Sequence, residues 1–444
     1  MTRVLFISSE PLGASIAGPA IRVLELARAV AAHCDVTVAA PGPSDAGDAP
    51  VEVLEAELSD FDRLLEALRG SDVVVAQRLP PQLLRYVARM PVRFVADLYN
   101  PQMIEVLEAF DEPGPDHRRA WRSMLGHLAV ADMAICASEK QRDLWLGGMS
   151  LAGLIDLPRY RADPTFRSFV DVVPFGVPER PPRHSGAVLK GVWPGIGPDD
   201  QVLLWAGGVW RWLDPLTPIR AVERLRAGGR PVHLVFLGTG RPTLQPGRVP
   251  TTADAAMGLV RDRGLEHCVH FNPGWVPYEE REGYLLESDL GVCAHYDHLE
   301  ARFSFRTRVL DHFWAGLPSV VSSGDSIGEL VERRGLGQAV APEDDEGFAA
   351  ACAALLDDRQ AYAAAAERVR ELAPSLRWSE AARPLVEFCL DPRRERPRPA
   401  RWTLVRATYG QYPDILADAR DVGGLREVAA RIPRHVARVL RHRA

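Results

Sequence analysis

The feature that most restricts the fold of this 444-residue chain is a regular alternation of strand-like and helix-like segments. Residues 3–8 form a short apolar run, residues 18–33 carry apolar residues at helical spacing, and residues 35–40 are strand-like again. A strand, a helix and a second strand in this order are typical of a βαβ unit, whose strands pair in parallel. We therefore predict an α/β protein built on parallel sheets.

The alternation occurs in two series, which are separated by a segment of linker composition. Further strands are predicted in the first series at residues 73–77, 92–97, 133–138 and 170–175, and in the second series at 202–208, 232–238, 268–271, 290–294 and 318–323. The segment 178–200 between them is rich in proline and glycine, as linkers often are. We predict two Rossmann-like domains, with the boundaries 1–185 for the first, 186–200 for a linker, 201–390 for the second and 391–444 for an extension.

Composition excludes several other classes of protein. An apolar content of 47% with 25% charged residues is that of a folded globular protein, and the net charge of −6 gives no reason to expect nucleic-acid binding. No apolar run approaches the roughly 20 residues that span a bilayer. The N-terminal segment is typical of a first strand and not of a signal peptide, so we expect a cytoplasmic protein.

Neither the cysteines nor the acidic pairs predict a metal or redox site. The six cysteines are scattered without a C-x-x-C pair and lie mostly in apolar segments, so we expect reduced thiols in the core. The one D-x-D motif, Asp60 to Asp62, opens an amphipathic segment in which Ser59 or Asp60 is a good helix N-cap. We predict no essential metal and no cofactor.

Four segments carry a resemblance to a known family. They are ISSEPLGASIAGPAIRVLELARAV (7–30), VVPFGVP (172–178), LLWAGGVWRWLDPLTPIRAV (203–222) and FRTRVLDHFWAGLPSVVSSGDSIGEL (305–330). In this order they resemble the first strand, glycine loop and helix, the end of the first domain, the start of the donor domain, and the donor-binding helix of GT-B glycosyltransferases of the retaining family four, the glycosyl transferases group 1 type. The likeness extends over residues 1 to 390.

The resemblance implies a GT-B fold, in which two Rossmann-like domains have parallel sheets that face a central cleft. Open parallel sheets bind ligands at the carboxyl ends of their strands, which also places a ligand in such a cleft. The resemblance further implies an enzyme of hexosyltransferase type. It would move a sugar, with retention of configuration, from a nucleotide-sugar donor to a hydroxyl group of a cell-surface glycan, a lipid-linked molecule or a natural product.

The start of the predicted donor-binding helix has the groups that a diphosphate requires. A nucleotide sugar carries about two negative charges, and a helix start offers unpaired N–H groups and the positive end of the helix dipole. Arg302, Arg306 or Arg308 can add charge-assisted hydrogen bonds, although not all three can point the same way. Asp311, about one turn further along, can accept hydrogen bonds from a ribose diol. The residues at the helix start itself are Ser304, Phe305, Arg306 and Thr307.

A solvated helix face is the alternative interpretation of these arginines and of Asp311.

The composition makes arginine the natural anion ligand, because Lys140 and Lys190 are the only lysines. This composition looks like the bias of a G+C-rich bacterial genome. Any anion site must therefore use arginine, backbone N–H groups or helix ends.

The acidic pair that the family places seven positions apart is incomplete in this chain. Asp311 stands where the family usually has its second glutamate, and the strict count puts Phe303 at the first position. Glu300, three residues earlier, is the predicted catalytic replacement. Asp97 ends a predicted strand where the family often has a polar residue facing the reacting sugar, and it is a second catalytic candidate. A cap or turn residue before Pro101 is the alternative for Asp97.

Glycines at strand ends are further candidates for donor binding. Gly207 and Gly208 allow the backbone to approach a ligand closely, and so does Gly18 in the loop after the first strand, where an ordinary turn is the alternative. The resemblance implies an arginine and a lysine that hold the phosphates in the loop after Gly208. This loop has one cation, Arg211, which we predict to take that role.

The extension 391–444 is basic, with thirteen arginines against six acidic residues. Its last part, 425–444, has the pattern of a basic amphipathic helix interrupted at Pro433, which would be attracted to the anionic inner face of a membrane where a lipid-linked acceptor lies. A solvated extension packed on the first domain is the alternative.

Two other functions remain open at this point. A GT-B nucleotide-sugar epimerase would use the same donor site, and a non-catalytic nucleotide-sugar-binding scaffold is conceivable because the first acid of the family pair is missing. In each case the expected partner is a nucleotide sugar.

Overall fold

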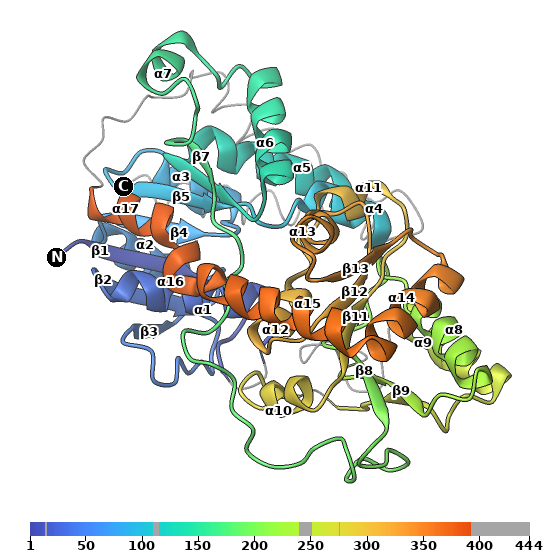
Figure 1. The fold of residues 1–444 in the computed structure, drawn as a ribbon. Coiled ribbons are helices and arrows are strands. Elements are labelled where there is room, and N and C mark those ends of the chain that lie inside the picture. Colours follow the sequence, from blue (N-terminus) through green and yellow to red (C-terminus); the bar gives the residue numbers. More distant parts are fainter. Residues whose placement is uncertain (14–15, 110–114, 239–250, 275, 392–444) are drawn as a thin grey trace, which may run out of the picture.

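The computed structural model of the chain describes residues 1–444 except 14–15, 110–114, 239–250, 275 and 392–444. The described residues form two parallel sheets, each flanked by helices, and the sheets belong to successive parts of the chain (Figure 1). The basic extension predicted over 391–444 lies outside the described residues apart from Asp391. The two-domain Rossmann-like architecture expected from the strand and helix alternation is confirmed.

The first sheet has seven strands in the order β3-β2-β1-β4-β5-β6-β7, and every neighbouring pair is parallel. The strands are β1 (Arg3–Ile7), β2 (Asp35–Ala40), β3 (Glu52–Glu55), β4 (Val73–Ala76), β5 (Arg93–Asp97), β6 (Met133–Cys136) and β7 (Val170–Val172). The inner strand β4 is apolar on both faces, because helices cover both sides of the sheet. These helices are α1 (Gly18–Ala31), α2 (Phe61–Arg69), α3 (Pro81–Val87), α4 (Gln102–Ala109), α5 (Pro115–Val130), α6 (Glu139–Leu151) and α7 (Leu157–Ala162).

The second sheet has six parallel strands in the order β10-β9-β8-β11-β12-β13. The strands are β8 (Gln201–Trp205), β9 (Val232–Phe236), β10 (Val269–Phe271), β11 (Leu290–Cys293), β12 (Ser319–Ser322) and β13 (Gly337–Val340). The helices that follow them are α8 (Leu216–Ala227), α9 (Thr251–Arg263), α10 (Arg281–Leu286), α11 (Leu299–Phe303), α12 (Thr307–Trp314), α13 (Ser326–Arg334), α14 (Asp345–Asp357) and α15 (Arg359–Leu372).

Two strands were not predicted from the sequence, β3 and β13. Both lie at an edge of their sheet, where only one neighbour is available. Their side chains are only partly buried, and β3 carries a glutamate at each end, so neither strand has the apolar run that marks an inner strand. The predicted strands are present, but most of them end one to three residues earlier than the apolar runs suggested.

The chain returns to the first domain near Arg377, after the 3₁₀ helix η1 (Ala373–Leu376). Helices α16 (Trp378–Ala381) and α17 (Arg383–Leu390) then pack against α1, as Figure 1 shows. The returning segment runs beside the outgoing one: the Val177 N–H donates to the Leu376 carbonyl, and the Trp378 N–H donates to the Val177 carbonyl. The two crossings between the domains are therefore held together by backbone hydrogen bonds.

Two smaller expectations, about the cysteines and about Asp60, are confirmed. All six cysteines are buried and form no disulfide. Asp60 caps α2, because its carboxylate accepts a hydrogen bond from the Arg63 N–H. Among the described residues, no helix has the length and apolar character needed to cross a bilayer.

Candidate active site between the two domains

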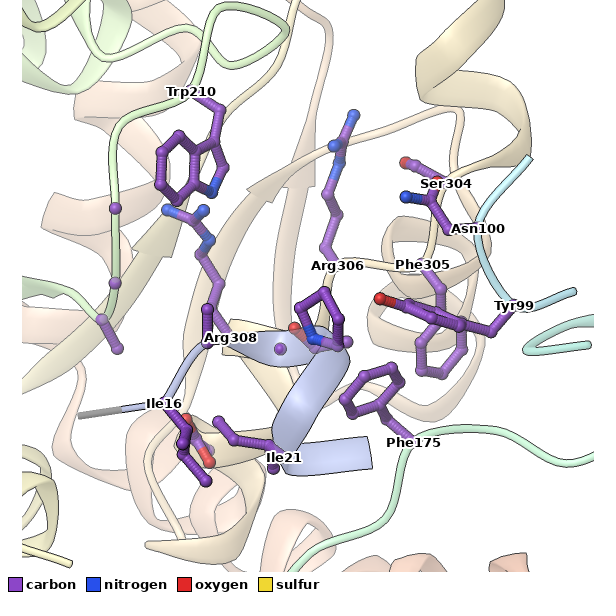
Figure 2. A pocket seen from close by; sticks show the side chains of 18 of the residues that line it. Ile16, Ile21, Tyr99, Asn100, Phe175, Trp210, Ser304, Phe305, Arg306 and Arg308 are labelled. Carbon is purple, nitrogen blue, oxygen red and sulfur yellow. The ribbon is translucent and has the colours of Figure 1, made fainter. Parts of the chain in front are cut away.

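A cavity of about 280 Å³ lies between the two domains. Residues that follow β1 and β5 form its wall on the first domain, and residues that follow β8, β9 and β11 form the opposite wall (Figure 2). All of these segments are at the carboxyl ends of parallel strands, where open sheets bind ligands. The volume is near the lower end of the range for small-molecule pockets.

Helix α12 begins at this cavity. The four residues predicted from the sequence for its start, Ser304, Phe305, Arg306 and Thr307, all line the cavity. No side chain caps the helix, and its first turn contains no acidic residue. The N–H groups of the first turn and the positive end of the helix dipole therefore favour an anion bound in the cavity.

Arg308, in the first turn of α12, is a cation that has no anionic partner among the described residues. Its Cζ atom lies 4.9 Å from the centre of the Trp205 ring, and in Figure 2 the side chain extends toward Trp210. The Nη1 atom is buried without a hydrogen-bond partner, and none of the described carboxylates forms an ion pair with the guanidinium. Burial lowers the pKa of Arg308 to about 10, so the side chain stays protonated at neutral pH.

Arg306 and Glu300 form a buried ion pair on the cavity wall. The Arg306 Nη2 and Nη1 atoms donate to the two carboxylate oxygens of Glu300 at 2.8 Å and 3.2 Å. The Arg306 Nε atom lies 3.6 Å from Asp325 but has no hydrogen-bond partner. The charge of Glu300, the predicted catalytic residue, is therefore balanced by an arginine that the sequence assigned to phosphate binding.

Asp311 also lines the cavity, one turn further along α12. Its Oδ1 atom lies 3.1 Å from Nη2 of Arg281, the first residue of α10. Burial raises the pKa of the Asp311 carboxyl, and the neighbouring Arg281 cation opposes this rise. The Asp311 side chain is 25% exposed, and it lines the cavity between the domains instead of an outer helix face.

The three predicted glycines line the cavity as well. Gly207 has a φ of +129°, which side chains rarely adopt, and a Cβ atom there would lie 3.9 Å from the Arg308 guanidinium. A Cβ atom at Gly208 would meet the Trp210 ring at 2.6 Å. At Gly18, the first residue of α1, a Cβ atom would meet no atom of the described residues within 4 Å, so this glycine leaves space in the cavity.

Three predicted site residues lie away from the cavity. Arg302 is exposed on α11, and Arg211 is not among the residues of the cavity wall. Asp97 is buried below the wall, where its carboxylate accepts hydrogen bonds from Arg22 at 2.8 to 3.0 Å. The structure thus gives Asp97 a position in a buried ion pair and not one facing the cavity, because Arg22 occupies both of its oxygens.

The sequence did not point to several residues that line the cavity. Tyr99, Asn100 and Gln141 come from the first domain, and Tyr278 and Arg281 come from the second. Tyr99 and Asn100 directly follow a predicted strand, so the strand-end rule alone would have found them. No motif marks Arg281, which reaches the cavity only through the packing of α10.

Gln141 and Lys140, near the start of α6, connect the two domains across the cavity. The Gln141 side chain is fully buried, and its amide nitrogen donates to the carbonyls of Tyr99 at 2.7 Å and Phe303 at 2.9 Å. The Lys140 amine donates to the Gly324 carbonyl at 2.9 Å and lies 2.7 Å from the Glu329 carboxylate. These contacts fix α11 and its Glu300 relative to the first domain.

Comparison with known proteins agrees with this architecture. Residues 200–358 match the family model described as glycosyl transferases group 1. No curated protein sequence matches the chain. Similar solved structures include sucrose-phosphate synthase from Thermosynechococcus elongatus, with a TM-score of 0.60 and 16% identity over 87% of this chain and 98% of the other.

Two further solved structures have the same likeness in fold. HepE from Anabaena, in complex with UDP-glucose, has a TM-score of 0.62 and 14% identity over 88% of this chain and 100% of the other. WaaG, a glycosyltransferase involved in lipopolysaccharide biosynthesis, has a TM-score of 0.58 and 16% identity over 87% of this chain and 99% of the other. The two facing Rossmann-like domains and the likeness to these solved structures show that this chain has the GT-B fold, and its residues 200–358 resemble the glycosyl transferases group 1.

Proposed function

We propose that the protein transfers a sugar from a nucleotide-sugar donor to a hydroxyl group of an acceptor. The observation that carries this proposal is Arg308, a protonated arginine that pairs with none of the described carboxylates. It lines the cavity at the uncapped start of α12, beside Gly207. A diphosphate placed there meets a guanidinium, helix N–H groups and a backbone that leaves room for it. The match of residues 200–358 to the glycosyl transferases group 1 and the likeness in fold to HepE, which was solved in complex with UDP-glucose, also support a nucleotide-sugar donor.

In this proposal the protein acts by positioning and electrostatics. Arg308 and the start of α12 stabilise the charge that develops on the leaving diphosphate, and Asp311 accepts hydrogen bonds from the ribose. Glu300, held in place by Arg306, faces the transferred sugar from the second domain. Retention of configuration requires the acceptor hydroxyl to attack from the face that the diphosphate leaves, and no residue then needs to form a covalent bond to the sugar.

The acceptor would enter on the wall formed by the first domain. Gly18 leaves open space there, and Asn100 donates a hydrogen bond to Glu105 at 2.6 Å, which presents a polar pair on this wall. A cell-surface glycan, a lipid-linked molecule and a natural product are the proposed acceptor classes. We also propose a cytoplasmic location. Membrane contact through the basic extension stays a prediction, because residues 392–444 are outside the described part of the chain.

The experiment that tests the proposal is incubation of the purified protein with a panel of nucleotide sugars and hydroxyl acceptors, with release of nucleoside diphosphate as the readout. A glycosyltransferase releases the diphosphate and forms a glycosylated acceptor. An epimerase would instead convert the donor into its isomer, and a scaffold would bind a nucleotide sugar without turnover. The absence of any binding to nucleotide sugars would remove all three functions.

Since the proposal includes no metal, the transfer rate should be the same with and without EDTA.

Domain closure is the first specific prediction. Gln141 and Tyr99 belong to the first domain and Phe303 to the second, so only the hydrogen bond from Gln141 to the Phe303 carbonyl requires the domains to be close together. The variant Gln141→Ala loses this one hydrogen bond between the domains, which contributes about 0.5 to 1.5 kcal/mol, so the closed arrangement should become about two- to tenfold less populated. We expect kcat to fall by about that factor, whereas the affinity for nucleoside diphosphate stays within about twofold of wild type.

Small-angle scattering provides the structural measurement for this prediction. Wild-type protein should become more compact when a nucleoside diphosphate and an acceptor are added together, and Gln141→Ala should respond less. An equal radius of gyration with and without both ligands in the wild-type protein would contradict domain closure.

A further inference from the structure

Arg281 occupies an unusual position between aromatic rings and a carboxylate. Its guanidinium carbon lies 3.5 Å from the centre of the Tyr278 ring and 5.0 Å from that of the Trp314 ring. Its Nη1 atom donates to the Tyr278 carbonyl, and its Nη2 atom lies 3.1 Å from Asp311 Oδ1. The side chain is therefore held on several sides in one orientation, as stacked arginines are.

Two nitrogen atoms of Arg281 have no hydrogen-bond partner among the residues that the structure describes, although Arg281 is only 8% exposed. They are Nε and Nη2, and the short distance from Nη2 to Asp311 is an ion pair without the angle of a hydrogen bond. Buried N–H groups of this kind are costly unless a partner satisfies them. Because Arg281 lines the cavity, a bound ligand is in a position to provide that partner.

The neighbouring residues keep this arrangement rigid. Arg180 lies on the segment that leaves the first domain. The Trp314 indole N–H donates to the Arg180 carbonyl at 2.7 Å, and the guanidinium carbon of Arg180 lies 5.7 Å from the centre of the Trp314 ring. Glu282, which follows Arg281, binds Arg180 at 2.5 Å and accepts a hydrogen bond from the Arg183 N–H at 2.8 Å. Arg281 is thus oriented before any ligand binds, which lowers the entropic cost of using its N–H groups.

We propose that Arg281 is a specificity residue for the ribose of the donor nucleotide and acts together with Asp311. Each ribose hydroxyl has one O–H donor and oxygen lone pairs that accept. Asp311 can only accept, and the guanidinium of Arg281 can only donate, so the pair matches both functions of a 2′,3′-diol. A 2′-deoxyribose lacks one hydroxyl and leaves part of the pair unsatisfied. This inference rests on the proposed function, since it assigns the sugar-ring contacts of the same donor site.

The test measures how well each variant distinguishes ribonucleotides from deoxyribonucleotides. Binding of UDP, GDP and ADP, each with its 2′-deoxy form, is measured by calorimetry to the full-length protein. Sites built to bind a hydroxyl group reject the analogue that lacks it, so wild-type protein should bind the 2′-deoxy form of its preferred nucleotide about tenfold or more weakly. For Arg281→Met we expect this ratio to fall to about twofold, with Arg281→Lys in between, because lysine keeps the charge but not the planar donor geometry.

Matched variants separate this effect from damage to the fold. Arg261→Met removes an exposed arginine from α9, and it should keep the wild-type ratio. The double variant Arg281→Met with Asp311→Asn removes both charges of the pair, so it tests the ratio without leaving a buried, unpaired carboxylate. General damage to the fold would weaken ribose and deoxyribose forms equally and leave their ratio unchanged.

The outcomes distinguish this inference from the proposed function. If wild type and all Arg281 variants have the same ratio of affinities, the inference is overturned while nucleotide binding stands. If the wild-type protein binds none of the three diphosphates, the donor site itself is refuted, and the role of Arg281 falls with it. A lower ratio in Arg281→Met and in the double variant, but not in Arg261→Met, supports the inference.

Discussion

Replacement of Arg308 by methionine is expected to weaken the binding of UDP, GDP or ADP by about ten- to a hundredfold. Hydrogen bonds to charged groups contribute roughly 1.5 to 3 kcal/mol, and the Arg308 guanidinium is the cavity cation that no described carboxylate neutralises. Methionine has a similar length and packs well on an aromatic ring, so the stacking on Trp205 should survive. The measurement is calorimetric titration of wild type and Arg308→Met with each of the three diphosphates.

Two comparisons make this prediction specific to the phosphates. The parent nucleoside, which lacks the diphosphate, should bind wild type and Arg308→Met equally. Arg302→Met is the matched control from the adjacent exposed part of α11, and we expect its affinity for the diphosphate to remain that of wild type. Equal diphosphate affinities of wild type and Arg308→Met would mean that the cavity binds its anion without this arginine, and the central support for the proposed function would be lost.

The largest effect on stability is expected from Arg22→Met. Arg22 and Asp97 are almost completely buried, with side-chain exposures of 0% and 2%, and the arginine also donates to the carbonyls of Val173 and Pro174. Removal of the cation leaves a buried carboxylate without its counter-ion, which costs roughly 3 to 5 kcal/mol. Urea denaturation followed by fluorescence should show this loss as a lower midpoint for the first domain.

Two variants check the cause of this loss. Arg3→Met removes an exposed arginine that pairs with the exposed Asp72, so its effect should be about 1 kcal/mol or less. Combining Arg22→Met with Asp97→Leu should recover much of the stability, because no buried charge then lacks a partner. A free energy of unfolding for Arg22→Met close to that of Arg3→Met would show that the buried pair does not stabilise the first domain.

The Arg22 pair also supports the cavity. The guanidinium carbon of Arg22 lies 5.0 Å from the centre of the Tyr99 ring and 5.2 Å from that of the Phe175 ring, and both rings belong to the cavity wall. Asp97, predicted from the sequence to face the reacting sugar, therefore contributes indirectly by orienting Arg22. Its position at a strand end was correctly read, but the direction of its side chain depends on a residue 75 positions away.

Much of the fold could be predicted because its information is local. A buried parallel strand such as β4 is an apolar run, and α1 has helical spacing within its own residues, so both are visible in a short window of sequence. The strands β3 and β13 escaped prediction because an edge strand is stabilised by one neighbour and keeps polar side chains. Their existence follows from pairing with β2 and β12, which is tertiary information.

The residues of the candidate site could also be predicted only in part from the sequence. The sequence by itself determined that a helix starts near Thr307 and that arginines and Asp311 surround this start, because these residues are neighbours along the chain. Only the tertiary structure decided which charges pair: Arg306 with Glu300, Arg281 with Asp311, and Arg308 with no described carboxylate. The physical reason is that the pairing of a long arginine side chain depends on the packing of other elements, such as α10 and the start of α6, against the cavity.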